Sequence, residues 1–252
     1  MALQILGTTA LVTGANRGIG RALVEALLER GAARVYATAR RPEALGDLVA
    51  RYGDRVVPLR LDVTRPSEVR AVAAQAGDVR LLINNAGIAA KFGGELTDAG
   101  WMTAARDEFE VNVLGTLSLT QGFAPMLAGR AGAAIVNISS VAGLAAFPAF
   151  VSYSGGKAAL HSLTQATRAL LAPHGVHVAG VYPGPIDTDM ARPFEMVKTA
   201  PEAAANAILD GLEDGREEIF PDPMAREVGE RFLHDPKAVE RQFAATATHT
   251  NA

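Results

Sequence analysis

Short apolar runs alternate along the chain with longer segments in which apolar residues recur every three or four positions. The short runs are rich in Val, Ile and Leu at consecutive positions, which is typical of strands buried on both faces of a parallel sheet. They lie at Thr9–Val12, Arg34–Thr38, Val56–Leu61, Leu81–Asn84, Ala133–Ile138 and Val176–Val181, and a shorter last strand is expected at Glu218–Phe220.

The segments between these runs have helical periodicity. Gly31 is placed to stop the first helix, and Pro66 with Ser67 and Glu68 is a typical helix start. The alternation predicts βαβ units, and therefore an α/β fold with a doubly wound parallel β-sheet flanked by helices on both faces. We expect helices at Gly18–Arg30, from Pro66 through Val69 and Val72, and at Met102–Leu127, Ser152–Leu171, Pro201–Leu212 and Pro223–Phe243.

No linker rich in Pro, Gly or Ser divides the 252 residues. We therefore expect a single domain, residues 1–252, with a different and more helical C-terminal part at about 190–244. Residues 245–252 are small and polar, and we expect them to form a flexible tail.

One stretch of the chain, Ala131–Gly156, contains no Asp, Glu, Lys or Arg. It is long enough to cross a membrane. Asn137, Ser140 and Pro148 interrupt it, and in hydrocarbon such breaks would leave backbone groups unpaired. We therefore predict a buried strand, a loop of small residues and a helix start here, and no membrane span.

Composition and charge exclude several classes of function. The 24 Lys and Arg against 27 Asp and Glu give a net charge of −3, so there is no electrostatic reason to expect nucleic acid. A hydrophobic share of 49% is that of an ordinary globular protein. The absence of cysteine rules out disulfides, thiolate nucleophiles and cysteine metal sites, and suits a reducing compartment. We expect a cytoplasmic protein because residues 1–14 lack a basic signal-peptide start and a cleavage-like site.

A glycine cluster follows the first predicted strand and precedes the first predicted helix. Its glycines are Gly14, Gly18 and Gly20, with the spacing G-x-x-x-G-x-G. Such glycines permit a sharp turn, the close approach of a phosphate, and tight packing of helix on strand. The helix N-terminus adds free N–H groups and a positive dipole end. The pattern favours nucleotide binding in a Rossmann fold over a purely structural turn.

The end of the second predicted strand indicates which nucleotide is bound. An acidic residue there would bind the ribose 2′-hydroxyl of NAD, whereas an arginine would accept the 2′-phosphate of NADP. The segment contains no carboxylate, and Arg40 offers a bidentate fork for phosphate. Arg17, inside the glycine loop, offers a second contact. The alternative is that both are solvated surface arginines. We predict NADP(H) as the cofactor.

Across about residues 8–190, the chain resembles the short-chain dehydrogenase/reductase family. The motifs of that family occur here in its order and spacing. They are Thr13-Gly14-x-x-x-Gly18-x-Gly20, Asp62-Val63, Asn84-Asn85-Ala86-Gly87, Asn112, Ser140, Tyr153-x-x-x-Lys157 and Pro183-Gly184-x-x-x-Thr188.

The resemblance implies four catalytic residues. Tyr153 would be the general acid/base on the substrate oxygen, and Ser140 would hydrogen-bond that oxygen. Lys157 would bind the nicotinamide ribose and lower the pKa of Tyr153, while Asn112 would hold a water of the proton relay. Tyr153 and Lys157 are four residues apart on a predicted helix, so both project from one face, and a neighbouring ammonium favours the phenolate. Ser139 is the rival serine, and the family spacing selects Ser140.

The resemblance also implies a cofactor site. Asp62 and Val63 would contact the adenine, and Thr188 would orient the carboxamide. The full set of expected cofactor-binding residues is Gly14, Asn16, Arg17, Gly18, Ile19, Gly20, Arg40, Asp62, Val63, Asn85, Ala86, Gly87, Tyr153, Lys157, Pro183, Gly184, Ile186 and Thr188.

Asn112 is an unexpected residue at its position in the predicted helix. Asn112 lies between two valines inside a predicted helix, where an amide is a poor choice because its side chain competes for backbone bonds. A buried functional amide explains the presence of Asn112 at this position.

His174 and His177 have no carboxylate beside them in the sequence, so we expect no metal site. Met224, Val228 and Phe232 form a stripe at helical spacing that we assign to the core or to a subunit contact.

After Thr188 the chain departs from the family pattern. The segment Asp189–Ala200 is short, which predicts an open substrate pocket. Glu217–Asp222 replaces the glycine-rich ending through which relatives usually make their tetramer contact. We still expect a homo-oligomer, dimer or tetramer, of a number that the sequence does not define. The candidate pocket residues are mostly apolar and favour an apolar ketone, aldehyde or alcohol. They are Phe92, Leu144, Phe147, Phe150, Met190 and Phe194.

Three functions stay open on the sequence alone. The favoured one is an NADP(H)-dependent carbonyl reductase or alcohol dehydrogenase. A nucleotide-sensing regulatory protein would not need to retain Ser140, Tyr153 and Lys157 together. An epimerase or dehydratase usually carries a larger substrate domain, for which 252 residues leave little room.

Overall fold

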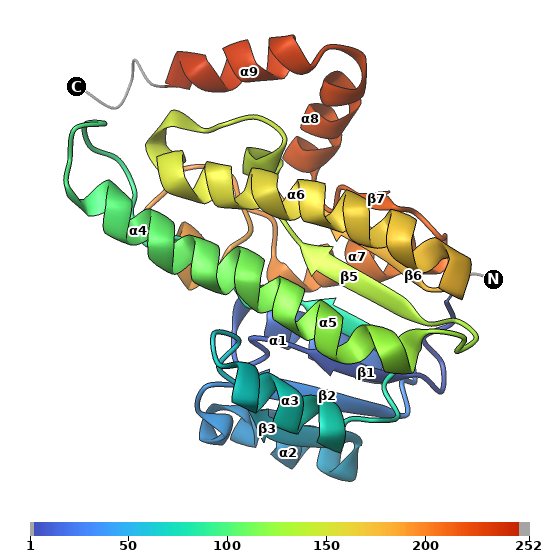
Figure 1. Cartoon of the computed structure of the whole chain (residues 1–252). Helices are drawn as coiled ribbons and strands as arrows, with labels where there is room; N and C mark the ends of the chain where they lie inside the picture. Colours follow the sequence, from blue (N-terminus) through green and yellow to red (C-terminus); the bar gives the residue numbers. More distant parts are fainter. Residues whose placement is uncertain (1–2, 247–252) are drawn as a thin grey trace.

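The computed structural model describes residues 3–246, in which seven parallel strands form one sheet with the order β3-β2-β1-β4-β5-β6-β7 (Figure 1). This order is the doubly wound Rossmann arrangement with one added edge strand, so the predicted fold class is confirmed. The strands are β1 (Thr9–Val12), β2 (Arg34–Ala39), β3 (Val56–Arg60), β4 (Leu81–Asn84), β5 (Ala134–Ile138), β6 (His177–Val181) and β7 (Glu218–Ile219).

The predicted helices are present, with three differences. The structure adds α2, a short helix that begins at a glycine and has little helical signal. A π-helical turn, Glu110–Leu114, interrupts the long predicted helix, and Pro236 splits the last one in two. The helices are α1 (Gly18–Glu29), α2 (Gly46–Tyr52), α3 (Pro66–Gln75), α4 (Gly100–Phe109), α5 (Gly115–Leu127), α6 (Val151–Leu171), α7 (Pro201–Glu213), α8 (Pro223–His234) and α9 (Pro236–Ala244).

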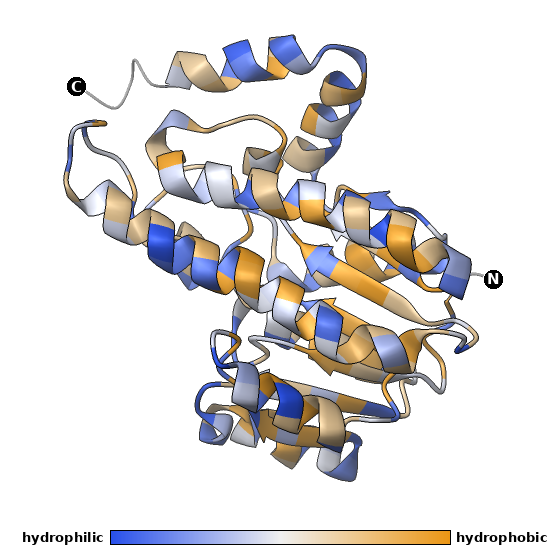
Figure 2. Cartoon of the chain, viewed as in Figure 1, coloured by the Kyte–Doolittle hydropathy of each residue, from blue (hydrophilic) through white to orange (hydrophobic). Residues whose placement is uncertain are grey.

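The side chains of the strands alternate between two apolar layers. In β1, Ala10 and Val12 join the cluster under α1, α2 and α7, whereas Leu11 joins the cluster under α3 and α5. Figure 2 shows the hydrophobic residues concentrated on the strands and on the helix sides that face them. The carboxyl ends of the strands lie at the edge of these two apolar layers. Ligands bind at that edge in sheets of this kind.

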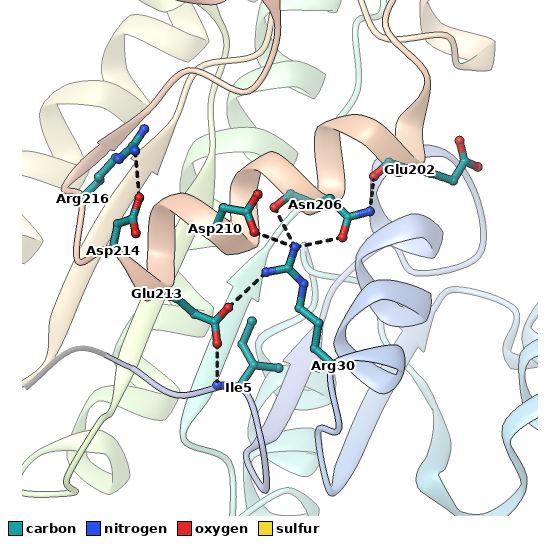
Figure 3. A network of polar contacts seen from close by, with 8 residues as sticks. All are labelled: Ile5, Arg30, Glu202, Asn206, Asp210, Glu213, Asp214 and Arg216. Atoms are coloured by element: carbon teal, nitrogen blue, oxygen red, sulfur yellow. Dashed lines mark hydrogen bonds and ion pairs between the residues drawn. The ribbon is translucent and has the colours of Figure 1, made fainter.

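Helices α1 and α7 are joined by a polar network around Arg30 (Figure 3). Its guanidinium binds Asp210 at 2.7 Å and Glu213 at 3.0 Å, and it donates to the side chain of Asn206 at 2.9 Å. Glu213 also accepts the backbone N–H of Ile5 at 3.3 Å. Because the Arg30 side chain is only 22% exposed, these bonds are less screened than ordinary surface pairs. They fix α7 beside the helix that follows the glycine loop.

Helices α8 and α9 lie apart from the two helical layers (Figure 1) and cover a third apolar cluster. This cluster contains Tyr182, Val228 and Phe243, with Met224 and Phe232 packed against it. Val228 is therefore a core residue, as the stripe predicted. Of the predicted tail, residues 247–252 lie outside the described part of the chain.

The neutral stretch forms β5, a loop and the start of α6, as predicted. Between residues 3 and 246, no helix is both long enough and apolar enough to cross a membrane.

Candidate active site

The loops that follow six of the strands meet at the carboxyl edge of the sheet and line one cleft of about 540 Å³. Its centre is the point where the strand order reverses, between β1 and β4, which is the expected ligand position of a doubly wound sheet.

The sequence-predicted site residues converge on this cleft, with two exceptions. Gly20 and Asn112 lie behind its wall. The predicted residues that line the cleft are Gly14, Asn16, Arg17, Gly18, Ile19, Arg40, Asp62, Val63, Asn85, Ala86, Gly87, Ser140, Tyr153, Lys157, Pro183, Gly184, Ile186 and Thr188.

The glycine loop is built as its spacing predicts. Gly14 and Gly18 have φ values of 64° and 53°, in the left-handed region that favours glycine. A Cβ on Gly20 would lie 2.4 Å from the Gly14 carbonyl oxygen and 2.4 Å from the side-chain nitrogen of Asn85. Gly20 therefore permits the close packing of loop on helix and does not face the ligand.

Asn85 and Thr13 hold this loop to the end of β4. The Asn85 side chain donates to the carbonyl oxygen of Thr13 at 2.8 Å, and the Thr13 hydroxyl accepts the N–H groups of Asn85 and Ala86, both at 2.9 Å. Thr13 is 1% exposed. This role of Thr13 was not predicted from the sequence, although a hydroxyl residue at the end of an apolar strand could have indicated it.

Asn112 is buried in the π-helical turn and pairs with one backbone residue. Its side-chain oxygen accepts the N–H of Ile88 at 2.8 Å, and its side-chain nitrogen donates to the Ile88 carbonyl at 2.9 Å. One helical turn earlier, Glu108 accepts the N–H of Ala90 at 2.6 Å. These two side chains fix the segment after Gly87, so the Asn112 amide has a structural partner that the sequence did not indicate.

Ser140, Tyr153 and Lys157 lie together at the floor of the cleft. The Ser140 hydroxyl donates to the carbonyl oxygen of Pro183 at 3.4 Å, and its interaction with the Tyr153 phenol acts to lower the pKa of Tyr153. Ser139 instead donates to the carbonyl oxygen of Lys157 at 3.2 Å and is 3% exposed. Of the two serines, Ser140 is therefore the one that contacts the phenol.

The pKa of Tyr153 differs from the sequence-based expectation. Burial raises the pKa of Tyr153 to about 12, the hydrogen bond with Ser140 opposes this rise, and the charge of Glu108 adds to it. Burial also lowers the pKa of Lys157 to about 8. Within the protein alone, desolvation thus outweighs the expected effect of the ammonium on the phenol.

Arg40 and Asp62 lie at the adenine end implied by the family pattern. Burial favours a raised pKa for Asp62, but hydrogen bonds from Thr64 and the charges of Arg65 and Arg40 outweigh it, and the pKa is lowered. The Thr64 hydroxyl donates to the Asp62 carboxylate at 2.7 Å. Asp62 is therefore held as an anion close to Arg40.

Arg17 has a partner far along the chain. Its guanidinium lies 3.1 Å from the carboxylate of Asp189, and both side chains are substantially exposed. The pair connects the glycine loop to the segment after β6. An exposed pair of this kind contributes little stability, about 0–1 kcal/mol, so Arg17 can exchange partners at low cost.

The segment after β6 lines the cleft and, although it is short, contacts the segments that follow β4 and β5. Phe194 from this segment packs edge-on against Phe92 at 4.5 Å between ring centres, and against Phe150 at 5.1 Å. Phe150 lies 5.6 Å from the Tyr153 ring. Five of the six predicted pocket residues line the cleft, whereas Leu144 packs against the third apolar cluster. Met224, assigned from its spacing to the core or to a subunit contact, also lines the cleft.

The described part of the chain contains no group of three or more His, Asp or Glu side chains placed to bind a metal ion. His177 instead contacts the carbonyl oxygen of Arg216 at 3.0 Å.

Comparison with known proteins agrees with this geometry. The family model described as short chain dehydrogenase matches residues 8–198. A crystal structure of a short chain dehydrogenase from Burkholderia cenocepacia J2315 in complex with NADP is 42% identical, with a TM-score of 0.87, and the match covers 96% of this chain and 99% of that one.

Curated relatives include two oxidoreductases. Oxidoreductase BOA17 of Botryotinia fuckeliana is 33% identical over 248 residues, which are 91% of this chain and 89% of that protein. The uncharacterized oxidoreductase YusZ of Bacillus subtilis is 36% identical over 190 residues, which are 72% of this chain and 66% of that relative's length, just under two thirds. The chain belongs to the short-chain dehydrogenase family of oxidoreductases.

Proposed function

We propose that the protein is an NADP(H)-dependent reductase of apolar ketones or aldehydes, which also oxidises the corresponding alcohols. The observation that carries the proposal is the position of Ser140, Tyr153 and Lys157 in one cleft with the glycine loop and Arg40. The similarity to a dehydrogenase whose crystal structure contains NADP supports the choice of cofactor.

The residues at the cleft fit a dinucleotide. The glycine loop and the first turn of α1 offer backbone N–H groups to the diphosphate. Arg40 would accept the 2′-phosphate, and Asp62 and Val63 would contact the adenine. Arg17 would reach the same phosphate by leaving Asp189. When bound, the nicotinamide supplies the hydride that reduces the carbonyl carbon.

Side chains of the protein then supply the proton that the substrate oxygen needs. The Tyr153 hydroxyl donates its proton to the substrate oxygen. The Ser140 hydroxyl, a single donor that lies 3.4 Å from the Pro183 carbonyl oxygen, would turn from that carbonyl to donate to the same substrate oxygen. Lys157 already donates to the Ile138 carbonyl at 2.7 Å, which leaves two of its three N–H groups for the nicotinamide ribose and a relay water. Asn112, through Ile88, would hold the wall beside that water.

The aromatic side chains of the cleft favour an apolar substrate. Phe92, Phe150 and Phe194 form an aromatic cluster that lines the cleft beside Tyr153, and apolar surroundings strengthen the hydrogen bonds made to the reacting oxygen. A charged substrate would lose its hydration there without an opposite charge in compensation.

Oligomerisation belongs to the same proposal, as a dimer or tetramer. Met102 and Phe109 on α4 and Leu170 on α6 are 62%, 44% and 73% exposed, and α4 packs against α6. Exposed apolar side chains on these two helices suit a contact with a second copy. A cytoplasmic location stays a prediction of the sequence.

The test is a screen of NADPH oxidation against ketones and aldehydes of graded polarity, with NADH in parallel. The proposal predicts turnover of apolar carbonyls with a strong preference for NADPH. Comparable efficiency with NADH, or a preference for charged substrates, would refute it. Tight NADPH binding without turnover on any substrate would favour the nucleotide-sensing alternative.

A further inference from the structure

Asp222 is a buried carboxylate in the segment that departs from the family pattern, directly before α8. It is 1% exposed. One oxygen accepts the N–H of Ala225 at 2.9 Å and caps the helix. The other accepts the N–H of Gly184 at 2.7 Å, from the turn that lines the cleft after β6. Asp222 therefore joins the C-terminal helices to the wall of the candidate active site.

The Gly184 N–H belongs to a peptide group that is bound at both of its ends. The carbonyl of that same peptide group, contributed by Pro183, accepts the N–H of Val141 at 3.0 Å and the hydroxyl of Ser140 at 3.4 Å. A charged acceptor on the N–H polarises the peptide group and strengthens the bonds at its carbonyl. The orientation of Ser140 thus depends on a peptide plane that Asp222 holds in place.

Space at this point is as restricted as the hydrogen bonding. A Cβ on Gly184 would lie 2.7 Å from a carboxylate oxygen of Asp222 and 3.3 Å from the Cβ of Met224. The glycine is therefore required for the approach of Asp222. Met224, two residues further on, itself lines the cleft.

We propose that Asp222 is a positioning residue, which fixes the Pro183–Gly184 peptide and through it both Ser140 and the nicotinamide side of the cofactor cleft. This inference rests on the proposed function, because it assigns Asp222 to the half of the cleft that would face the nicotinamide. The adenine half, with Arg40 and Asp62, lies on other strands and does not depend on Asp222.

The chain offers a matched control. Asp235 precedes Pro236 and caps α9 through Ala238 at 3.0 Å, just as Asp222 precedes Pro223 and caps α8. Asn is as good a helix cap as Asp. Asp222→Asn keeps an oxygen that can accept the N–H of Ala225, but it places an amide donor opposite the N–H of Gly184. Asp235→Asn keeps an oxygen for the N–H of Ala238, so its helix cap is retained.

The experiment compares NADPH and 2′,5′-ADP binding to the wild type, Asp222→Asn and Asp235→Asn, by fluorescence and calorimetric titration. We expect Asp222→Asn to weaken NADPH binding about tenfold, as the loss of one charge-assisted bond implies. Binding of 2′,5′-ADP, which probes only the adenine half, stays within about twofold of the wild type for both variants. Asp235→Asn leaves both ligands unaffected.

Asp222→Ser, which retains a helix cap, replaces Asp222→Asn if the latter does not fold. NADPH binding to the Asp222 variant within about twofold of the wild type would overturn the inference alone. Equal weakening of NADPH and 2′,5′-ADP would also overturn it, since that result indicates a general loss of structure. A wild type that binds no NADPH would overturn the proposed function, and this inference with it.

Discussion

The Nζ atom of Lys157 lies 5.6 Å from the centre of the Tyr153 ring, one turn further along α6. Lys157 is 4% exposed, and its ammonium donates to the carbonyl oxygen at the end of β5. Burial lowers the pKa of Lys157 and raises that of Tyr153. The two groups therefore provide a protonated phenol beside a weakened ammonium, which suits the donation of a proton to a carbonyl oxygen.

The rate of reduction should fall at alkaline pH. Tyr153, with a pKa of about 12, keeps its proton across the usual range, whereas Lys157, with a pKa of about 8, loses its charge as pH rises through that value. We expect kcat/KM for carbonyl reduction to be level near neutral pH and to fall about tenfold per unit above about pH 8. A steady rise toward high pH would contradict the assigned roles.

Lys157 should also make stability depend on pH. Its pKa falls from an ordinary 10.5 to about 8 on folding, so the unfolded chain binds more protons between these values and stability rises with pH in this window. Urea unfolding should show the wild type gaining up to about 3 kcal/mol relative to Lys157→Met between about pH 7 and 11. A difference that does not change with pH would show that the folded state does not disfavour the ammonium.

Arg40 should decide the choice between the two nicotinamide cofactors. Replacing it by alanine removes the guanidinium fork that we assign to the 2′-phosphate, so KM for NADPH should rise about 10- to 100-fold while KM for NADH stays unchanged. Arg41 is the control, since it is exposed and does not line the cleft. If Arg41→Ala has the same effect, the phosphate site lies elsewhere.

Two glycine substitutions should have opposite effects on stability. Gly20→Ala places a methyl group 2.4 Å from the Gly14 carbonyl oxygen, which should cost about 1–3 kcal/mol. Gly155 is exposed on α6 with nothing within 4 Å of a new Cβ, so Gly155→Ala should stabilise the protein by about 0.5–1 kcal/mol. Denaturant unfolding measures both. A neutral Gly20→Ala would contradict the tight loop.

The periodicity of the sequence predicted most of the fold, because each buried strand and each amphipathic helix is defined by its own residues. Helix α2 was missed because it has only seven residues and begins at Gly46. The break between α8 and α9 could have been predicted, since Asp235-Pro236 is a typical helix start. The π-helical turn contains Asn112, whose hydrogen-bond partner Ile88 lies 24 residues away and is not indicated by the local sequence.

The motifs predicted the cleft residues, whereas partners distant in the sequence were missed. Asn85 holds the glycine loop through Thr13, and Asp222 holds Gly184 from 38 residues away. The short segment after Thr188 contacts the opposite wall of the cleft through one side chain, Phe194, which packs against Phe92. These contacts depend on how the loops meet at the carboxyl edge of the sheet, and local sequence patterns do not encode that meeting.

The most direct test of the proposed chemistry is carbonyl reduction by Tyr153→Phe, with NADPH binding measured on the same preparation. Phenylalanine retains the ring packed against Phe150 and removes only the hydroxyl that would donate the proton. We expect NADPH binding to weaken by no more than about tenfold, because only one of the expected cofactor contacts is lost, and kcat to fall about 10²- to 10⁴-fold. Turnover equal to that of the wild type would contradict the assignment of Tyr153 as the general acid.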